Sequence, residues 1–191
     1  MIIGITGKSG SGKSYISEKL TTQLNAIHVE IDKVSHDVLY SENSKPFLKE
    51  EFGEAIFENG VLNRKQLGKI VFDNKEKLTK LNQFCQTKME EILDETIKSN
   101  LGKTIILDYA LLPWLKQFEV CDVKILVTSS FEDRFSRAAK RENITKEYYQ
   151  KRDASLKGYD DLVFDITINN SEQINFDALI KTIQTYGEKH D

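Results

Sequence analysis

The residues with the clearest chemical potential lie near the N-terminus, in a loop rich in glycine. Residues 7–14 read Gly-Lys-Ser-Gly-Ser-Gly-Lys-Ser, which fits the phosphate-binding loop pattern of glycine, four residues, glycine, lysine and serine or threonine. Glycine permits positive φ and lets backbone N–H groups approach an anion closely. The sequence therefore predicts a binding site for a nucleoside triphosphate, formed by Gly7, Lys8, Ser9, Gly10, Ser11, Gly12, Lys13, Ser14 and Tyr15.

The last two residues of the loop have different predicted tasks. The ammonium of Lys13 adds a point charge beside the β- and γ-phosphates, and the Ser14 hydroxyl is a hard oxygen ligand suited to Mg²⁺. An apolar run at 1–6 precedes the loop and a helical pattern at 15–24 follows it, which is the context that the motif requires. This context argues against the alternative, a glycine-serine turn that binds nothing.

Short strands that alternate with helical patterns indicate the fold. Runs rich in β-branched residues lie at 26–31, 104–107, 123–128 and 166–168. The alternation predicts a single α/β domain, a three-layer parallel sheet of the P-loop NTPase type with helices on both faces. In such sheets ligands bind beyond the carboxyl ends of the strands. The polar residues near these ends are Thr6, Asp32, Asp108 and Thr128.

The stretch at 35–102 carries only helical signals. Asn63 with Gln66 and Asp73 with Glu76 have the spacing of capping boxes, which marks two helix starts. Apolar residues at intervals of three and four then form one stripe that must pack against other residues. We expect a helical subdomain inserted into the domain of residues 1–191. The stripe consists of Leu78, Leu81, Cys85, Met89, Ile92 and Thr96.

A second helical region, at about 129–157, is predicted to form a lid. Ser129 with Glu132 has capping-box spacing, Asn143 ends the helix, and Thr145 caps the next one. Arginines at 134, 137 and 141 share one face of this helix because they are three and four residues apart. Arg137 and Arg141 are candidates to stabilise the charge of the triphosphate; a solvated basic surface is the alternative. A last amphipathic helix is expected at 175–186.

Bulk properties exclude several classes of protein. The net charge of −3, from 27 basic and 30 acidic residues, is spread along the chain without a basic block suited to nucleic acid. Cys85 and Cys121 are far apart, so we expect two reduced thiols. No apolar stretch approaches the ~20 residues of a membrane span, and the early strand leaves no room for a cleavable signal. We expect a cytoplasmic protein without nucleic acid or membrane partners; its oligomeric state stays open.

A phosphate loop occurs in motors, GTPases and small-molecule kinases, so other residues must decide. The nearest approach to a guanine-binding signature, at 74–77, ends in lysine where aspartate is needed, and 191 residues are few for a motor. A kinase with a small acceptor fits better. Phosphoryl transfer needs a group that orients the acceptor hydroxyl and takes its proton. Asp32, after the second strand, is predicted to do so; the alternative is that it caps a helix.

Four segments together resemble the dephospho-coenzyme A kinase family. They are the strand and loop at 2–15, Val-Glu-Ile-Asp-Lys-Val at 29–34, the segment 52–72 with its Asn-Gly-Val-Leu-Asn-Arg stretch, and the lid. The lid contributes Arg137, Arg141, Glu142, Ile144, Thr145 and Arg152. With Ile168, Asn169 and Asn170 the resemblance spans most of the chain.

The resemblance implies transfer of the γ-phosphate of ATP to the ribose 3′-hydroxyl of dephospho-coenzyme A, with Mg²⁺. It places the pantetheine-bearing acceptor on the helical insertion and adenine near Asn169 and Asn170. It also implies that Ser14 binds the metal. The catalytic residues implied are Asp32, Lys13, Arg141 and Arg137.

Two departures from the family pattern fall on the acceptor side. Phe84-Cys85-Gln86 stands where the family usually has a histidine-proline pair. The sequence at 110–114, Ala-Leu-Leu-Pro-Trp, lacks the glutamate that the family has after the third strand. Two alternatives therefore stay open: a nucleoside or nucleoside-monophosphate kinase, which shares loop, sheet and lid, and a nucleotide-binding module without turnover.

Overall fold

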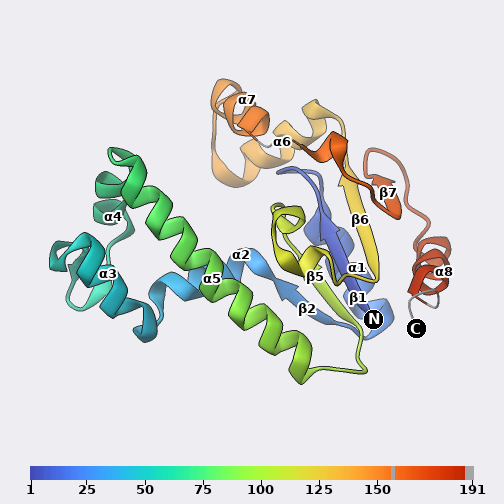
Figure 1. The fold of residues 1–191 in the computed structure, drawn as a ribbon. Coiled ribbons are helices and arrows are strands. Elements are labelled where there is room, and N and C mark those ends of the chain that lie inside the picture. The colour runs from blue at the N-terminus through green and yellow to red at the C-terminus, as the bar shows by residue number, and fades with distance from the viewer. Residues whose placement is uncertain (156–157, 188–191) are drawn as a thin grey trace. The chain divides into compact units, whose positions relative to one another are not determined.

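The computed structural model describes residues 1–155 and 158–187, and the chain divides into two compact units (Figure 1). The first comprises Met1–Glu30 and Asn100–Asp191, and the second comprises Ile31–Ser99. A five-stranded sheet forms the centre of the first unit, whereas the second is mainly helical.

All strands of the main sheet are parallel, in the order β2-β5-β1-β6-β7. The predicted α/β fold is therefore confirmed, and β6 has the predicted bounds. β5 begins and ends one residue later than expected, which places Asp108 inside the strand. The strands are β1 (Ile2–Thr6), β2 (Ile27–Glu30), β5 (Ile105–Asp108), β6 (Val123–Thr128) and β7 (Ile166–Asn169).

Alternate residues of β1 face opposite sides of the sheet. Ile3 and Ile5 are fully buried in a core that also contains residues of α1 (Lys13–Leu24) and α8 (Phe176–Gly187). Gly4 faces the other side, where a Cβ atom would lie 2.8 Å from the Cys121 sulfur. That side is covered by short 3₁₀ turns at Leu112–Trp114 and Lys116–Phe118. Both sides of β1 are thus covered within the first unit.

Two helices, α6 (Phe131–Glu142) and α7 (Lys146–Ser155), follow β6. The cap of α6 is Ser130, whose hydroxyl accepts from the Asp133 N–H at 3.1 Å, so the prediction of Ser129 was wrong by one residue. The Ser129 hydroxyl instead accepts from Arg137. The predicted end at Asn143, in the left-handed conformation (φ 50°), and the Thr145 cap are confirmed. Residues 156–157 of the predicted lid lie outside the described residues.

The second unit has its own apolar core, beneath α2 (Ile31–Tyr40), α3 (Lys45–Phe52), α4 (Arg64–Phe72) and α5 (Lys75–Ser99). The predicted Asn63 cap of α4 is confirmed, since its side chain accepts from the N–H groups of Lys65 and Gln66. The cap of α5 is Asn74, whose Oδ1 accepts from the Lys77 N–H at 3.0 Å, so the Asp73 prediction was wrong by one residue. The buried residues of this core are Leu48, Phe52, Ile56, Leu62, Leu67, Val71 and Leu81.

One element of this unit contradicts the prediction of helices alone. β3 (Phe57–Glu58) and β4 (Val61–Leu62) pair as an antiparallel hairpin. Its turn consists of Asn59 (φ 50°) and Gly60 (φ 77°), both with the positive φ that a two-residue hairpin turn requires. An Asn-Gly pair predicts this turn, but the hairpin was overlooked because helical patterns lie on either side of it.

The start of α2 corrects another prediction. The second strand was expected to reach Ile31, but it ends at Glu30, and Ile31 begins the helix. Asp32 therefore lies in the first turn of α2, where its charge interacts favourably with the helix dipole. In the described part of the chain, none of the helices combines the length and the apolar character needed to cross a membrane.

Candidate active site

The phosphate-binding loop joins β1 to α1. Gly12 (φ 91°) precedes the helix in the left-handed conformation. Among the described residues, no side chain caps the N-terminus of α1, and the first turn holds no acidic residue. The first N–H groups of a helix have no partner within it, and the helix dipole makes this end positive. The loop is therefore built to receive an anion such as a phosphate group.

Packing around the loop leaves no room for side chains at two of its glycines. A Cβ atom at Gly10 would lie 2.2 Å from the backbone oxygen of Arg134, and one at Gly7 would lie 2.3 Å from the backbone oxygen of Val127. Both positions also have positive φ. Glycine is thus required there for close packing as well as for backbone conformation.

A buried charge pair lies at the end of the loop. The Lys13 ammonium lies 3.3 Å from Asp108 Oδ1, and His28 Nε2 lies 3.5 Å from Oδ2 of the same carboxylate, which is only 3 % exposed. Burial alone raises the pKa of Asp108, but the polar contact with His28 and the charge of Lys13 outweigh it, so the pKa lies below its ordinary value. Asp108 is thus a carboxylate at neutral pH, held beside the lysine of the motif.

Arg137 braces the loop from outside. Its guanidinium donates to the carbonyl oxygens of Gly10 at 3.1 Å and Ser11 at 3.3 Å, and to that of Asn170 at 3.1 Å. The Asn170 side-chain amide also donates to the Ser11 carbonyl, at 2.8 Å. Two residues predicted to contact the nucleotide directly therefore hold the backbone of the loop in this structure.

Two arginine side chains contact the Ser9 hydroxyl. Arg152 Nη2 donates to it at 2.8 Å, and Arg141 Nη2 approaches it at 3.5 Å. Glu142 forms ion pairs with both arginines. Burial raises the pKa of Glu142, but the hydrogen bonds from Arg152 and Arg141 outweigh it and leave the pKa below its ordinary value. Arg141 and Arg152 are thus held near the loop by a carboxylate counter-ion.

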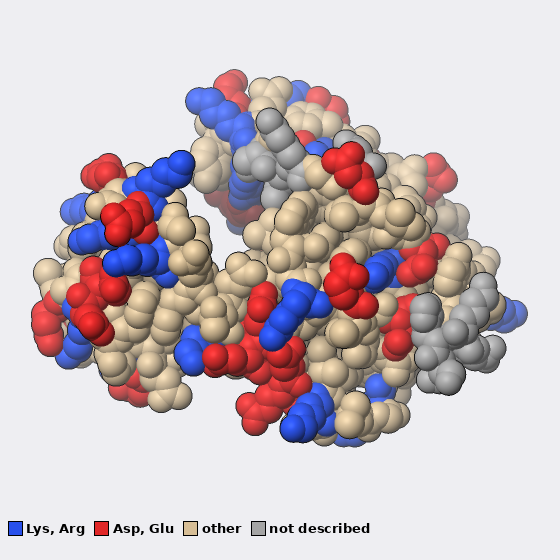
Figure 2. All heavy atoms as spheres, viewed as in Figure 1, with Lys and Arg blue, Asp and Glu red and all other residues tan. Residues whose placement is uncertain are grey.

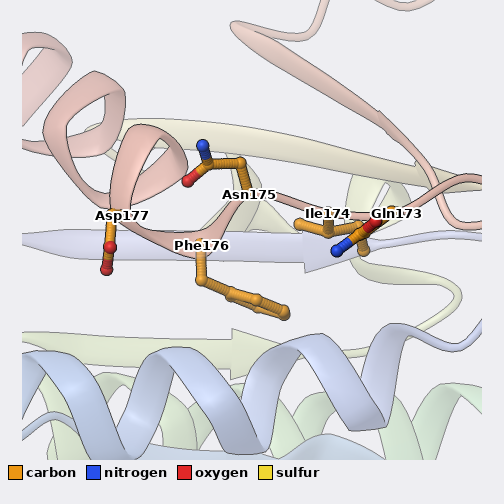
Figure 3. Close-up of a pocket in the computed structure, with 5 residues that line it drawn as sticks. All are labelled: Gln173, Ile174, Asn175, Phe176 and Asp177. Carbon is orange, nitrogen blue, oxygen red and sulfur yellow. The ribbon is translucent and has the colours of Figure 1, made fainter.

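A hollow at the start of α8 includes Phe176, whose ring contacts Tyr15, a residue predicted to bind the nucleotide. Figure 3 shows Phe176 extending toward α1, where its ring meets Tyr15 edge-on at a centroid distance of 6.0 Å. The hollow is lined by the segment from Gln173 to Asp177. Asn169 makes local contacts: its amide donates to Glu172 and its oxygen accepts from the Ser171 N–H.

The structure places the predicted site residues in both units. The loop, Arg137, Arg141, Asn169 and Asn170 belong to the first unit, whereas Asp32 belongs to the second. Asp32 is exposed, and it is the acidic residue of the first turn of α2. On the face shown in Figure 2, basic and acidic side chains are interspersed on each unit, in keeping with the mixed charges of the sequence.

Sequence reasoning missed several contacts of the loop. Asp108 was placed near the site because it follows an apolar strand, but its pairing with Lys13 was not foreseen. Tyr149 was not considered at all, although its hydroxyl donates to the Ser9 carbonyl at 2.6 Å. In the sequence, Tyr149 stands out only as a tyrosine in a strongly polar helix. Helical periodicity does not relate such a residue to a loop near the other end of the chain.

Comparisons with known proteins agree with this geometry. The family model for dephospho-CoA kinase matches residues 1–175. A dephospho-CoA kinase of Fusobacterium nucleatum is 31 % identical over 98 % of this chain and 97 % of its own length. One of Listeria monocytogenes is 32 % identical, covering 98 % and 96 % of the two chains. The structure of the Campylobacter jejuni dephospho-CoA kinase shares the fold, with a TM-score of 0.60 at 20 % identity over 98 % of this chain and 96 % of that one.

The phosphate loop, the parallel sheet and these similarities over nearly the whole length agree with one another. The chain belongs to the dephospho-CoA kinase family.

Proposed function

We propose that this protein transfers the γ-phosphate of ATP to the ribose 3′-hydroxyl of dephospho-coenzyme A, giving coenzyme A and ADP. The observation that carries the proposal is the family match over residues 1–175 in a chain that retains the phosphate loop with its buried Lys13–Asp108 pair. A kinase of this family needs a site for the triphosphate, a way to neutralise its charge, and a group that receives the acceptor proton.

The loop supplies the triphosphate site. The free N–H groups at the start of α1 face the phosphates, and Lys13 moves its ammonium from Asp108 toward the β- and γ-oxygens. Because Lys13 and Asp108 are only 14 % and 3 % exposed, their charges are little screened by water. The ammonium therefore stabilises the charge that spreads over the transferred group.

The oxygen atoms around Lys13 also suit Mg²⁺. The site offers the Ser14 hydroxyl and the carboxylate of Asp108, whose Oδ1 is buried without a well-directed hydrogen bond. Hard oxygen ligands of this kind fit the preference of the ion. When bound, Mg²⁺ neutralises charge on the phosphate oxygens. Ser14 and Asp108 would hold the ion directly or through its waters.

On the acceptor side we propose Asp32 as the group that orients the ribose hydroxyl and accepts its proton. Asp32 follows the last residue of β2 by two positions, and Glu30 of that strand pairs in register with Asp108 of β5. The chain itself therefore ties Asp32 to the carboxyl end of the sheet, where ligands of such folds bind. We further propose that the insertion, residues 35–102, holds the pantetheine arm.

The arginines of the predicted lid have separate proposed roles. Arg141 is 63 % exposed, so it can turn from Glu142 to the terminal phosphate without loss of packing. Arg137 is bonded to the loop carbonyls, and we propose that it acts on the phosphates through the loop.

A coupled assay of ADP release across acceptors tests the proposed function. We expect turnover with dephospho-coenzyme A and ATP, and none with uridine or nucleoside monophosphates. Phosphorylation of those acceptors alone would replace the proposal with a nucleoside or nucleoside-monophosphate kinase. ATP binding without turnover of any acceptor would indicate a nucleotide-binding module.

A further inference from the structure

Tyr149 occupies an unusual place in the first unit. It belongs to α7, a helix with little apolar character, yet it is fully buried. Its ring packs against Phe131 and Phe135 of α6, with centroid distances of 5.5 and 5.7 Å. Its hydroxyl donates to the Ser9 carbonyl of the phosphate loop at 2.6 Å. A buried phenol needs a hydrogen-bond acceptor for its O–H group, and here the acceptor is a carbonyl group of the predicted nucleotide site.

The same hydroxyl is also part of a network of charged side chains. It accepts from Arg134 Nη1 at 3.0 Å, and Arg134 is only 8 % exposed. Arg134 also forms an ion pair with Asp153, whose carboxylate lies 3.8 Å from the ammonium of Lys8 in the loop. The Ser9 carbonyl and the Lys8 side chain are therefore both tied to α6 and α7 through one network of polar contacts.

The ring of Tyr149 has a second contact with the site. The Arg152 guanidinium lies over it, 5.5 Å from the ring centroid, and the same guanidinium donates to the Ser9 hydroxyl at 2.8 Å. A cation over an aromatic face is attracted by the ring electrons. The hydroxyl of Tyr149 thus fixes the backbone of the loop at Ser9, while its ring fixes an arginine beside the Ser9 side chain.

We infer that Tyr149 is a positioning residue of the nucleotide site: its hydroxyl sets the conformation of the loop at Ser9, and its ring, together with the carboxylate of Glu142, sets the position of Arg152. The inference rests on the proposed function for its effect on ATP, but the ordering of the loop is a property of the free protein. Two substitutions separate these roles, one that removes the hydroxyl alone and one that removes the hydroxyl and the ring.

Tyr149→Phe removes the hydroxyl and keeps the ring. Loss of one hydrogen bond of ordinary strength predicts that amide exchange at residues 9–11 of the free protein becomes about 2- to 12-fold faster. Exchange in β1 and β6 should change less, because their core packing is kept. The KM for ATP and its dissociation constant from calorimetry should rise by a similar factor, while kcat stays near that of the parent.

Tyr149→Leu removes the ring as well. Here kcat should also fall, by about 10-fold or more. Arg152 loses the ring contact and keeps only its ion pair with Glu142, and an arginine at a phosphoryl-transfer site contributes about 10³- to 10⁵-fold when fully engaged. Tyr148→Phe is the matched control, because Tyr148 is the neighbouring residue and is 57 % exposed. It should match the parent in every measurement.

Two results would overturn the inference. One is Tyr149→Phe with loop exchange and ATP affinity like the parent; the other is faster exchange in the core strands with the loop unchanged, which indicates packing alone. If the parent protein binds ATP but phosphorylates no dephospho-coenzyme A, the proposed function fails, yet the exchange and affinity measurements still decide the role of Tyr149.

Discussion

The two units differ in what holds their functional residues. In the first unit, polar contacts between distant segments converge on a short loop: Arg137, Asn170 and Tyr149 all bond to its carbonyl groups. In the second unit, the core is apolar, and the Phe47 and Phe84 rings stack at 3.9 Å. The loop of the first unit is positioned by directional hydrogen bonds, whereas the second unit is held by the packing of apolar side chains. The nucleotide side should therefore respond to single polar changes, and the acceptor side to changes of packing.

The largest effect is expected at Asp32, a polar residue of the second unit and therefore an exception to this contrast. Asp32→Asn should lower kcat by about 10²- to 10⁴-fold, the usual contribution of a general base. The ATP dissociation constant should stay nearly unchanged because the phosphate loop is intact. Steady-state kinetics and calorimetry provide the two values.

Asp37→Asn is the control for Asp32, because Asp37 lies on the same helix with its side chain 81 % exposed. Equal activity of Asp32→Asn and the parent would reject the role of base. It would leave Asp32 as a residue that stabilises the start of α2.

Lys13→Ala should lower kcat and ATP affinity together. Removal of one preorganised charge typically costs about 10²- to 10³-fold in rate. The substitution also leaves the Asp108 carboxylate buried without its counter-ion, which destabilises the fold. The double variant Lys13→Ala/Asp108→Asn should recover thermal stability but not turnover, so the two effects separate. Recovery of turnover in the double variant would contradict the role of Lys13.

Arg141→Ala should lower kcat by about 10²-fold. A lone arginine finger contributes about 10³- to 10⁵-fold, but the expected loss is smaller here because Arg152 also contacts the Ser9 hydroxyl. Lys140→Ala, an exposed neighbour on α6, is the control. If Arg141→Ala behaves like the parent in single-turnover kinetics, this arginine belongs to the solvated surface.

The smallest expected effect concerns the second unit. Phe84→Leu removes the stacked pair with Phe47, worth about 0.5–1.5 kcal/mol of unfolding free energy. Urea unfolding followed by circular dichroism should show this loss, whereas ATP affinity should not change. Phe72→Leu, at a side chain 80 % exposed, should alter neither. An equal loss of ATP affinity in Phe84→Leu would show that the contrast between the units is wrong.

The sequence predicted much of this structure because short-range spacing determines it. The loop at 7–14 lies between a strand and a helix as expected, and the order of elements in the sheet unit follows from alternating patterns. The caps at Ser130 and Asn74 were misplaced by one residue, because adjacent polar residues offer the same signal. The hairpin at Asn59 and Gly60 was missed because it is too short to interrupt a helical pattern.

The contacts that brace the loop were beyond such reasoning. Ser9 and Tyr149 are 140 residues apart, and no spacing rule connects a tyrosine in a polar helix with a backbone carbonyl in a distant turn. The roles of Arg137 and Arg141 illustrate the same limit. Their shared helix face was predicted from the sequence, but only tertiary structure turns one toward carbonyl groups and the other toward a carboxylate.

The two cysteines acquire a chemical meaning from the proposed acceptor. Burial raises the pKa of Cys85 to about 11 and that of Cys121 to about 12, so both remain thiols at neutral pH. Dephospho-coenzyme A and its product each carry a free sulfhydryl, and exchange with disulfides proceeds through the thiolate. An enzyme whose own cysteines stay protonated, one of them partly buried and the other buried, can process such molecules without becoming covalently attached to them.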